Sequence, residues 1–237
     1  SPGSGCRAGL EGVVKRESLP AKAPSGAQGW FLHTRREKFK APRVREALGN
    51  AFDFEWTNKT IMYGAYLRTV SPFQNSDMMA VGPPSPEELA LLEPFRGKVP
   101  AEVFGTPYVP PISDGSGQDR ALLKKAVALL EEAGCVTKDR KRLTAAGEPF
   151  RIEFLLDEPT FQPHHMPYIK NLGTVGIEAA VRRVDPWQFR ARRDDFDFDV
   201  AIERPRFWTV PGGSLRTAFA MPSSATKGPT TAAGIVG

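Results

Sequence analysis

The sequence predicts an α/β fold from three observations between residues 150 and 203. Residues 150–156, 177–184 and 196–203 have the β-rich, alternating composition of strands. Helical segments separate the first strand from the second and the second from the third. Strands that alternate with helices pair in parallel through right-handed crossovers. Ligands of such sheets bind beyond the carboxyl ends of the strands, which here are the loops at residues 157–161, 184–187 and 204–208.

Different signals mark the two helices between these strands. The first is predicted from apolar residues at three-residue spacing, Met166, Ile169 and Leu172. This segment also contains Pro163 and Pro167, which are expected in or before the first turn because proline has no backbone N–H to donate. The second helix is expected to begin at Asp185-Pro186, with the proline at its first position.

The first part of the chain predicts one short strand and two helices. The strand is expected at residues 29–34. Pro42 then begins a helix whose apolar residues share one face, namely Val44, Ala47, Leu48, Ala51 and Phe52. Asp53 is expected to cap a second helix. The apolar residues of that second helix are Trp56, Ile61, Met62, Ala65 and Tyr66.

The middle of the chain alternates irregular segments with two more helices. Residues 70–84 have turn chemistry and residues 94–118 are rich in Pro and Gly, so both are predicted to be irregular. Between them, Ser85-Pro86-Glu87-Glu88 is a capping box that opens a short helix. A longer helix is predicted at residues 119–133, with Gly134 as its cap. Its apolar face is Leu122, Ala126, Leu129, Leu130 and Ala133, and a polar hairpin or loop follows at residues 138–147.

The composition indicates a globular protein. With 237 residues, of which 41% are apolar, the chain is long enough for one large domain or two small ones. The 32 basic and 27 acidic residues leave a net charge of only +5, so no nucleic-acid partner is expected. Cys6 and Cys135 are too few for a disulfide framework, and one bridge or two free thiols are both open. No apolar run is long enough to span a membrane, and residues 1–5 show no signal-peptide pattern.

Several motifs, in order along the chain, resemble one protein family. The motifs GWFL at 29–32, RVREAL at 43–48 and AFDFEW at 51–56 resemble the opening of the second lobe of family 5 solute-binding proteins. These are the extracytoplasmic peptide-binding components of ABC importers. Further motifs are similar to the branch that includes the microcin C and oligopeptide binding protein of Gram-negative bacteria. They are YGAY at 63–66, NSD at 75–77, PSPEEL at 84–89, EVFG at 102–105 and DDFDFD at 194–199.

The resemblance implies two α/β lobes that close around a peptide or peptide-like ligand and deliver it to an ABC permease in the inner membrane. This chain would be the second lobe of a type II periplasmic-binding-protein-like fold, with a mixed sheet and flanking helices, and the first lobe would precede it. The resemblance also implies a periplasmic location, a monomer, no cofactor and no enzymatic activity. The expected organisation is a loosely ordered lead-in at residues 1–28, the lobe at residues 29–216 and a low-complexity tail at residues 217–237.

Five residues are the predicted ligand contacts. Arg204, Arg206, Phe207 and Trp208 follow the third strand and combine cations with aromatic rings, which suits a peptide carboxylate and apolar side chains. A surface loop or a lobe-contact segment is the alternative for these four. His33 stands where the family has Asn at the end of a strand, so it is either a cleft residue or a structural histidine.

Other clusters of polar residues do not predict a metal site. His164 and His165 are adjacent, hence on different sides of a helix, and no third ligand is spaced to join them. A cluster of four aspartates, Asp194, Asp195, Asp197 and Asp199, could suggest a cation site. Within the third predicted strand, however, Asp197 and Asp199 alternate with two phenylalanines, so the carboxylates are expected on a solvated or salt-bridged face. The expected partners are Arg190, Arg192 and Arg193.

Catalytic motifs are absent from the sequence. It contains no Gly-x-Ser-x-Gly elbow, no phosphate-binding Walker loop and no His-Glu-x-x-His motif. A binding protein is therefore expected. The alternative is a small α/β interaction or regulatory module that has no transported ligand.

Overall fold

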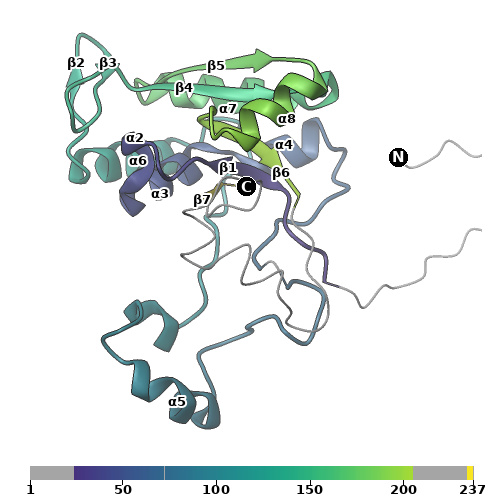
Figure 1. The fold of residues 1–237 in the computed structure, drawn as a ribbon, viewed down its shortest axis with the longest axis vertical. Helices are drawn as coiled ribbons and strands as arrows, with labels where there is room; N and C mark the ends of the chain where they lie inside the picture. The colour runs from purple at the N-terminus through teal and green to yellow at the C-terminus, as the bar shows by residue number, and fades with distance from the viewer. Residues whose placement is uncertain (1–23, 72, 205–233, 237) are drawn as a thin grey trace, which may run out of the picture.

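A mixed five-stranded sheet forms the centre of the protein (Figure 1). The structure is a computed structural model, and it describes residues 24–71, 73–204 and 234–236. The strand order is β5-β4-β6-β1-β7. The strands are β1 (Gly29–Leu32), β4 (Arg151–Leu156), β5 (Glu178–Arg183), β6 (Val200–Glu203) and β7 (Gly234–Val236). The sheet and its flanking helices confirm the predicted α/β class.

The parallel part of the sheet follows the predicted alternation of strands and helices. β4 pairs in parallel with both β5 and β6. α7 (Gln162–Thr174) connects β4 to β5, and α8 (Pro186–Asp194) connects β5 to β6. Asp185 caps α8 by accepting a hydrogen bond from the Gln188 backbone N–H at 2.9 Å. β1 runs antiparallel to both β6 and β7, which makes the sheet mixed.

β6 is shorter than predicted. Residues 196–199 were expected in the strand, but β6 begins only at Val200. Phe196 has a φ of 59°, in the left-handed region, which an extended strand cannot accommodate. The alternation of aromatic and acidic residues there therefore belongs to a turn that follows α8, and the predicted strand at these positions is wrong.

The two faces of the sheet have separate apolar clusters. Ile152 and Phe154 of β4 face the larger core, whereas Leu155 faces a smaller cluster that includes Phe189 of α8. The helices α3 (Pro42–Ala51), α6 (Arg120–Glu132) and α7 supply the helical side of the larger core. Their buried residues are Val44, Ala47, Leu48, Ala51, Leu123, Ala126, Leu129, Leu130, Tyr168 and Leu172.

The predicted Asp53 cap of α4 (Phe54–Thr60) is confirmed, and Gly134 follows the end of α6 as predicted, with a φ of 82°. In α6, Asp119 caps the helix and Leu123 is buried, whereas Leu122 is only half-buried. Asp53 caps α4 through the Trp56 N–H at 2.9 Å. The predicted continuation of α4 is wrong, because the helix ends at Thr60 and the side chain of Tyr66 is 60% exposed.

The buried face of α7 differs from the prediction. Met166 is 52% exposed, and the buried positions are instead His165, Tyr168, Asn171 and Leu172. His165 and Tyr168 pack on Trp30 at ring-centroid distances of 5.4 Å and 4.9 Å, so aromatic contacts set the orientation of the helix.

Pro167 lies inside α7, which the prediction did not allow. An N–H at this position would bond to the carbonyl of residue 163, four residues earlier. Pro163 is exposed, so water can satisfy that carbonyl and the helix tolerates the proline.

Smaller elements complete the described chain. α2 (Glu37–Lys40) follows β1, η3 (Pro159–Phe161) precedes α7, and the predicted hairpin is β2 (Thr137–Lys138) with β3 (Lys141–Arg142). The predicted capping box opens α5 (Pro86–Leu92), with both of its hydrogen bonds present. α5 lies away from the sheet in Figure 1, together with η1 (Glu93–Phe95) and η2 (Ala101–Phe104).

The two ends of the chain are described only in part. β7 lies within the expected tail, where the backbone of residues 234–236 pairs with β1. Residues 217–233 of that tail, most of the lead-in and Cys6 lie outside the described residues. Cys135 is buried and forms no disulfide with the described residues. Within the described ranges, no helix is both long and apolar enough to cross a membrane.

Replacing Leu172 by Ala should destabilise the protein by roughly 2–5 kcal/mol, because this side chain is fully buried in the larger core. The matched control is Met166→Ala on the same helix, which should change stability by only about 0.5 kcal/mol because Met166 is exposed. Urea unfolding of both variants measures the difference. Equal destabilisation would show that α7 presents a different face to the sheet.

Candidate ligand site

A pocket of about 230 Å³ lies where the parallel strands β4 and β6 end. Phe161 reaches it from the segment after β4, and Arg204 reaches it directly after β6. β1 is antiparallel to β6, so its first residue, Gly29, lies at the same edge of the sheet. The pocket therefore lies at the edge of the sheet that is formed by the carboxyl ends of its parallel strands, where α/β sheets bind ligands.

Aromatic side chains form the walls of this pocket. Trp30 and Phe52 meet edge to face, with ring centroids 4.7 Å apart, and Phe54 packs on Phe52 at 6.4 Å. On another side, Phe161 and His164 lie 5.7 Å apart. Met62, Tyr66 and Leu67 contribute from the segment after α4. Such walls favour apolar or aromatic groups of a ligand.

Several polar groups around the pocket have no protein partner within the described ranges. The buried Trp30 Nε1 and the buried His164 Nδ1 form no hydrogen bond there. Arg204 is exposed, lines the pocket, and forms no hydrogen bond or ion pair with the described residues. The two nitrogens have almost no accessible surface, so of these groups the exposed guanidinium of Arg204 is the one suited to bind an acceptor atom of a ligand.

Arg68 adds a positive charge beside the aromatic walls. Its guanidinium lies 5.5 Å from the ring centroid of Phe52 and 5.4 Å from that of Phe54. Its Nε and Nη1 atoms are buried and have no hydrogen-bond partner within the part of the chain that the structure describes. Burial lowers the pKa of Arg68, while the carboxylate of Glu55 opposes that change. The guanidinium of an arginine stays protonated even when burial lowers its pKa in this way, so the positive charge of Arg68 favours an anionic ligand.

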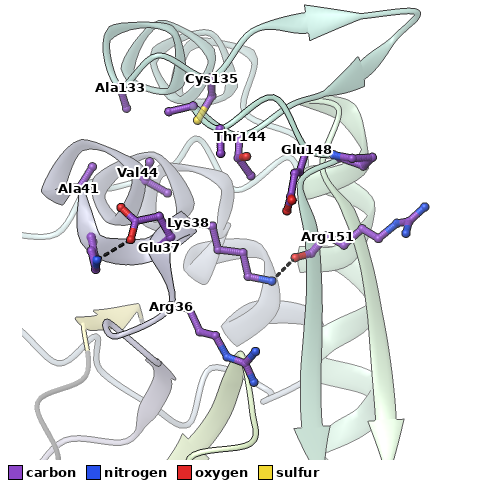
Figure 2. Close-up of a pocket in the computed structure, with 14 residues that line it drawn as sticks. Arg36, Glu37, Lys38, Ala41, Val44, Ala133, Cys135, Thr144, Glu148 and Arg151 are labelled. Carbon is purple, nitrogen blue, oxygen red and sulfur yellow. Dashed lines mark hydrogen bonds and ion pairs between the residues drawn. The ribbon is translucent and has the colours of Figure 1, made fainter.

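A larger hollow of about 920 Å³ lies at the opposite edge of the sheet, between α2, the end of α6 and the start of β4 (Figure 2). It is lined by cations, but they have protein partners. Lys38 donates to the Arg151 carbonyl and to Asp199, Lys40 pairs with Glu37, and Arg151 pairs with Glu178. Because these charges are already neutralised, the smaller aromatic pocket is the better candidate for ligand binding.

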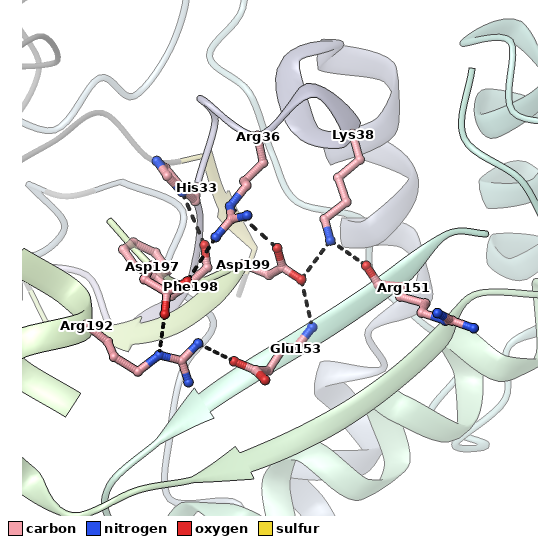
Figure 3. Close-up of polar contacts among 9 residues, drawn as sticks. All are labelled: His33, Arg36, Lys38, Arg151, Glu153, Arg192, Asp197, Phe198 and Asp199. Atoms are coloured by element: carbon pink, nitrogen blue, oxygen red, sulfur yellow. Dashed lines mark hydrogen bonds and ion pairs between the residues drawn. The ribbon is translucent and has the colours of Figure 1, made fainter. Parts of the chain in front are cut away.

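His33 lies at this opposite edge, away from Arg204. Its neighbour Leu32 pairs with Val200 at the start of β6. The ring is buried, stacks on Phe196 and Phe198, and places Nδ1 3.1 Å from the Phe198 carbonyl oxygen (Figure 3). Burial lowers the pKa of His33, and the nearby cations Arg36 and Arg35 lower it further against the hydrogen bond to Phe198.

The aspartates near His33 form ion pairs (Figure 3). Asp199 accepts from Lys38 Nζ at 2.7 Å and from the Glu153 backbone N–H at 3.0 Å. Arg192 joins Asp197 at 2.9 Å to Glu153 at 2.7 Å. The predicted salt-bridged face is therefore confirmed for Asp197 with Arg192 and for Asp194, which pairs with Arg190 at 3.8 Å. Asp197 also pairs with Arg36, which precedes α2, and Asp199 pairs with Lys38 of α2. The described residues contain no group of three or more His, Cys, Asp or Glu side chains that could hold a metal ion.

The structure brings together only part of the predicted site. Of the three predicted ligand loops, those after β4 and β6 reach the pocket, and the loop after β5 does not because β5 is at the far side of β4. Arg206, Phe207 and Trp208 lie outside the described residues. Sequence reasoning missed the wall residues Phe52 and Phe54 as site residues. Their only signal was an aromatic excess around the Asp53 cap.

Comparison with known proteins identifies the family. A family model described as bacterial extracellular solute-binding proteins, family 5 Middle, matches residues 11–225. The chain belongs to this family. It is a family of binding proteins and not of enzymes. The closer assignment to the microcin C branch stays a prediction.

Two relatives match this chain over only part of their own length. A probable peptide-binding protein, YejA of Agrobacterium fabrum, is 36% identical over 95% of this chain and 37% of that protein. The uncharacterised YejA of Escherichia coli is 42% identical over 79% of this chain and 31% of that protein. The chain thus spans about a third of the length of these relatives.

A solved structure supports the fold. The oligopeptide-binding protein AppA from Bacillus subtilis, determined in complex with a nonapeptide, superposes with a TM-score of 0.61 at 18% identity. The match covers 85% of this chain and 34% of AppA. The described residues therefore have the fold of part of this oligopeptide-binding protein.

His33 predicts a pH dependence of stability. Its folded pKa is lowered by burial, so below about pH 6.5 the unfolded state binds more protons and stability falls as the pH falls. Urea midpoints at about pH 7.5 and about pH 5.5 should therefore differ more in the wild type than in His33→Gln. Equal changes in both proteins would show that the folded ring accepts a proton without cost.

Proposed function

We propose that this chain is the second lobe of a solute-binding protein that binds peptides or peptide-like compounds in the periplasm and delivers them to an ABC permease in the inner membrane. The observation that carries the proposal is the aromatic pocket at the carboxyl edge of the parallel strands, in a chain of family 5. The pocket combines apolar walls with the exposed, unpaired guanidinium of Arg204, which is the chemistry of a specific small-ligand site.

The pocket residues suit the end of a peptide. The walls around Trp30 and Phe52 accept an apolar or aromatic side chain. Arg204 at the rim is placed to bind a carboxylate through two parallel N–H donors. Arg68 adds positive charge behind the rings of the wall. Together these features favour a ligand with an aromatic group next to a negative charge.

Two further lines support peptides as the ligand class. The Agrobacterium relative is a probable peptide-binding protein, and the AppA structure holds a nonapeptide. Arg206, Phe207 and Trp208 lie two to four residues after Arg204 in the sequence, so we include them as ligand contacts in the proposal. His33 is not included, because it lies at the other edge of the sheet.

Replacing Arg204 by Gln should weaken binding of a tripeptide such as Ala-Ala-Phe by about tenfold or more, because a charged hydrogen bond to the peptide carboxylate is lost. Isothermal titration of the complete polypeptide that carries this chain measures the affinity.

The matched control is Lys124→Gln, which removes the same charge from an exposed position of α6 outside the pocket and should leave the affinity unchanged. No binding across a diverse library of short peptides would contradict the proposed function. Equal binding by wild type and Arg204→Gln would contradict only the role of Arg204.

A further inference from the structure

Residues 70–71 and 73–112 form an excursion that leaves the sheet and its helices and carries α5 (Figure 1). In the described part of the chain, 14 large apolar side chains are exposed, and 8 of them lie on this excursion. Val81 is 92% exposed and Ile112 is 76% exposed. Single exposed apolar residues are ordinary on protein surfaces, but a concentration of this kind marks an interaction surface.

α5 also exposes apolar side chains. The helix has a complete capping box and a proline at its first position, yet none of its residues is buried. Leu91 is 75% exposed. Short helices in proteins gain most of their stability from packing an apolar face, and a helix of this length is marginal alone. The described residues therefore cover the apolar side chains of α5 only in part, because Leu89 and Leu92 are half-buried and Leu91 is exposed.

Three of these exposed side chains, those of Val81, Leu91 and Val103, line a defined groove. It has a volume of about 570 Å³ and lies between α5, the preceding segment and the residues after η2. Val81, Leu91, Leu92 and Val103 give it an apolar lining. The carboxylates of Glu88 and Glu102 also line it. The groove therefore fits an apolar segment that carries a basic residue.

We propose that a segment from the part of the polypeptide that lies outside these 237 residues binds in this groove. The chain spans 37% of the Agrobacterium relative and 31% of the Escherichia coli relative, so most of each protein is outside the matched region. A large uncovered apolar surface on a piece of a longer protein is one half of an internal interface. The proposal requires a longer polypeptide and holds whatever the aromatic pocket binds.

Cysteine labelling tests the proposal directly. Leu91→Cys, in a Cys6→Ser background, is treated with iodoacetamide in the 237-residue chain and in the complete polypeptide, and labelling is read at each site by peptide mass spectrometry. Cys135 is buried and contributes little background. We expect labelling of Leu91→Cys to be about tenfold slower or more in the complete polypeptide, because the groove is covered there. Lys138→Cys, at an exposed position in β2, is the control and should react equally in both proteins.

A second variant tests whether the groove is the place where the segment binds. In the complete polypeptide, Leu91→Asp should speed the labelling of Val81→Cys by placing a charge in the apolar groove. Equal labelling of Leu91→Cys in the two proteins would overturn the proposal. A labelling rate that falls with the concentration of the isolated chain would assign the groove to a second copy of this chain and would also overturn it. A gene that encodes only these 237 residues would also overturn the proposal.

Discussion

The antiparallel pairing of β1 with β6 is the constraint on which the rest of the structure depends. It joins the start of the described chain to its end, in a register that pairs Gly29 with Glu203 and Leu32 with Val200. The register places Gly29 beside Arg204 at one edge of the sheet and His33 beside Asp199 at the other. A shift by one residue would turn Trp30 and Leu32 from the core toward the opposite face. The pocket would then lose its central aromatic wall.

The two edges of the sheet differ in how their polar groups are satisfied. At the edge near His33, ion pairs and backbone hydrogen bonds connect α2, β4 and the turn before β6, with Asp199 at the centre. At the edge near Arg204, the polar groups of Trp30, His164 and Arg204 have no partners within the described residues. Satisfied networks make a structure rigid, whereas the exposed, unpaired guanidinium of Arg204 is available to a ligand. The first edge therefore stabilises the fold, and the second is suited to recognition.

Local chemistry made most of the fold predictable. Caps at Asp53, Ser85, Asp119 and Asp185 fixed where four helices begin, and the alternation of strands and helices predicted the parallel pairs. The face of α7 was not predictable from apolar spacing, because its buried side includes His165 and Asn171, whose burial depends on tertiary partners. The pocket was only half predictable. Its loops follow from topology, but its walls join residues 52 and 161, which only the folded chain brings together.

The most direct test of the account is a crystal structure of the complete polypeptide with a bound peptide. We predict density for an aromatic side chain against Trp30 and Phe52, and for the peptide carboxylate within hydrogen-bond distance of Arg204. A peptide bound instead in the cation-lined hollow beside Lys38, or an aromatic pocket filled by the protein's own side chains, would contradict it.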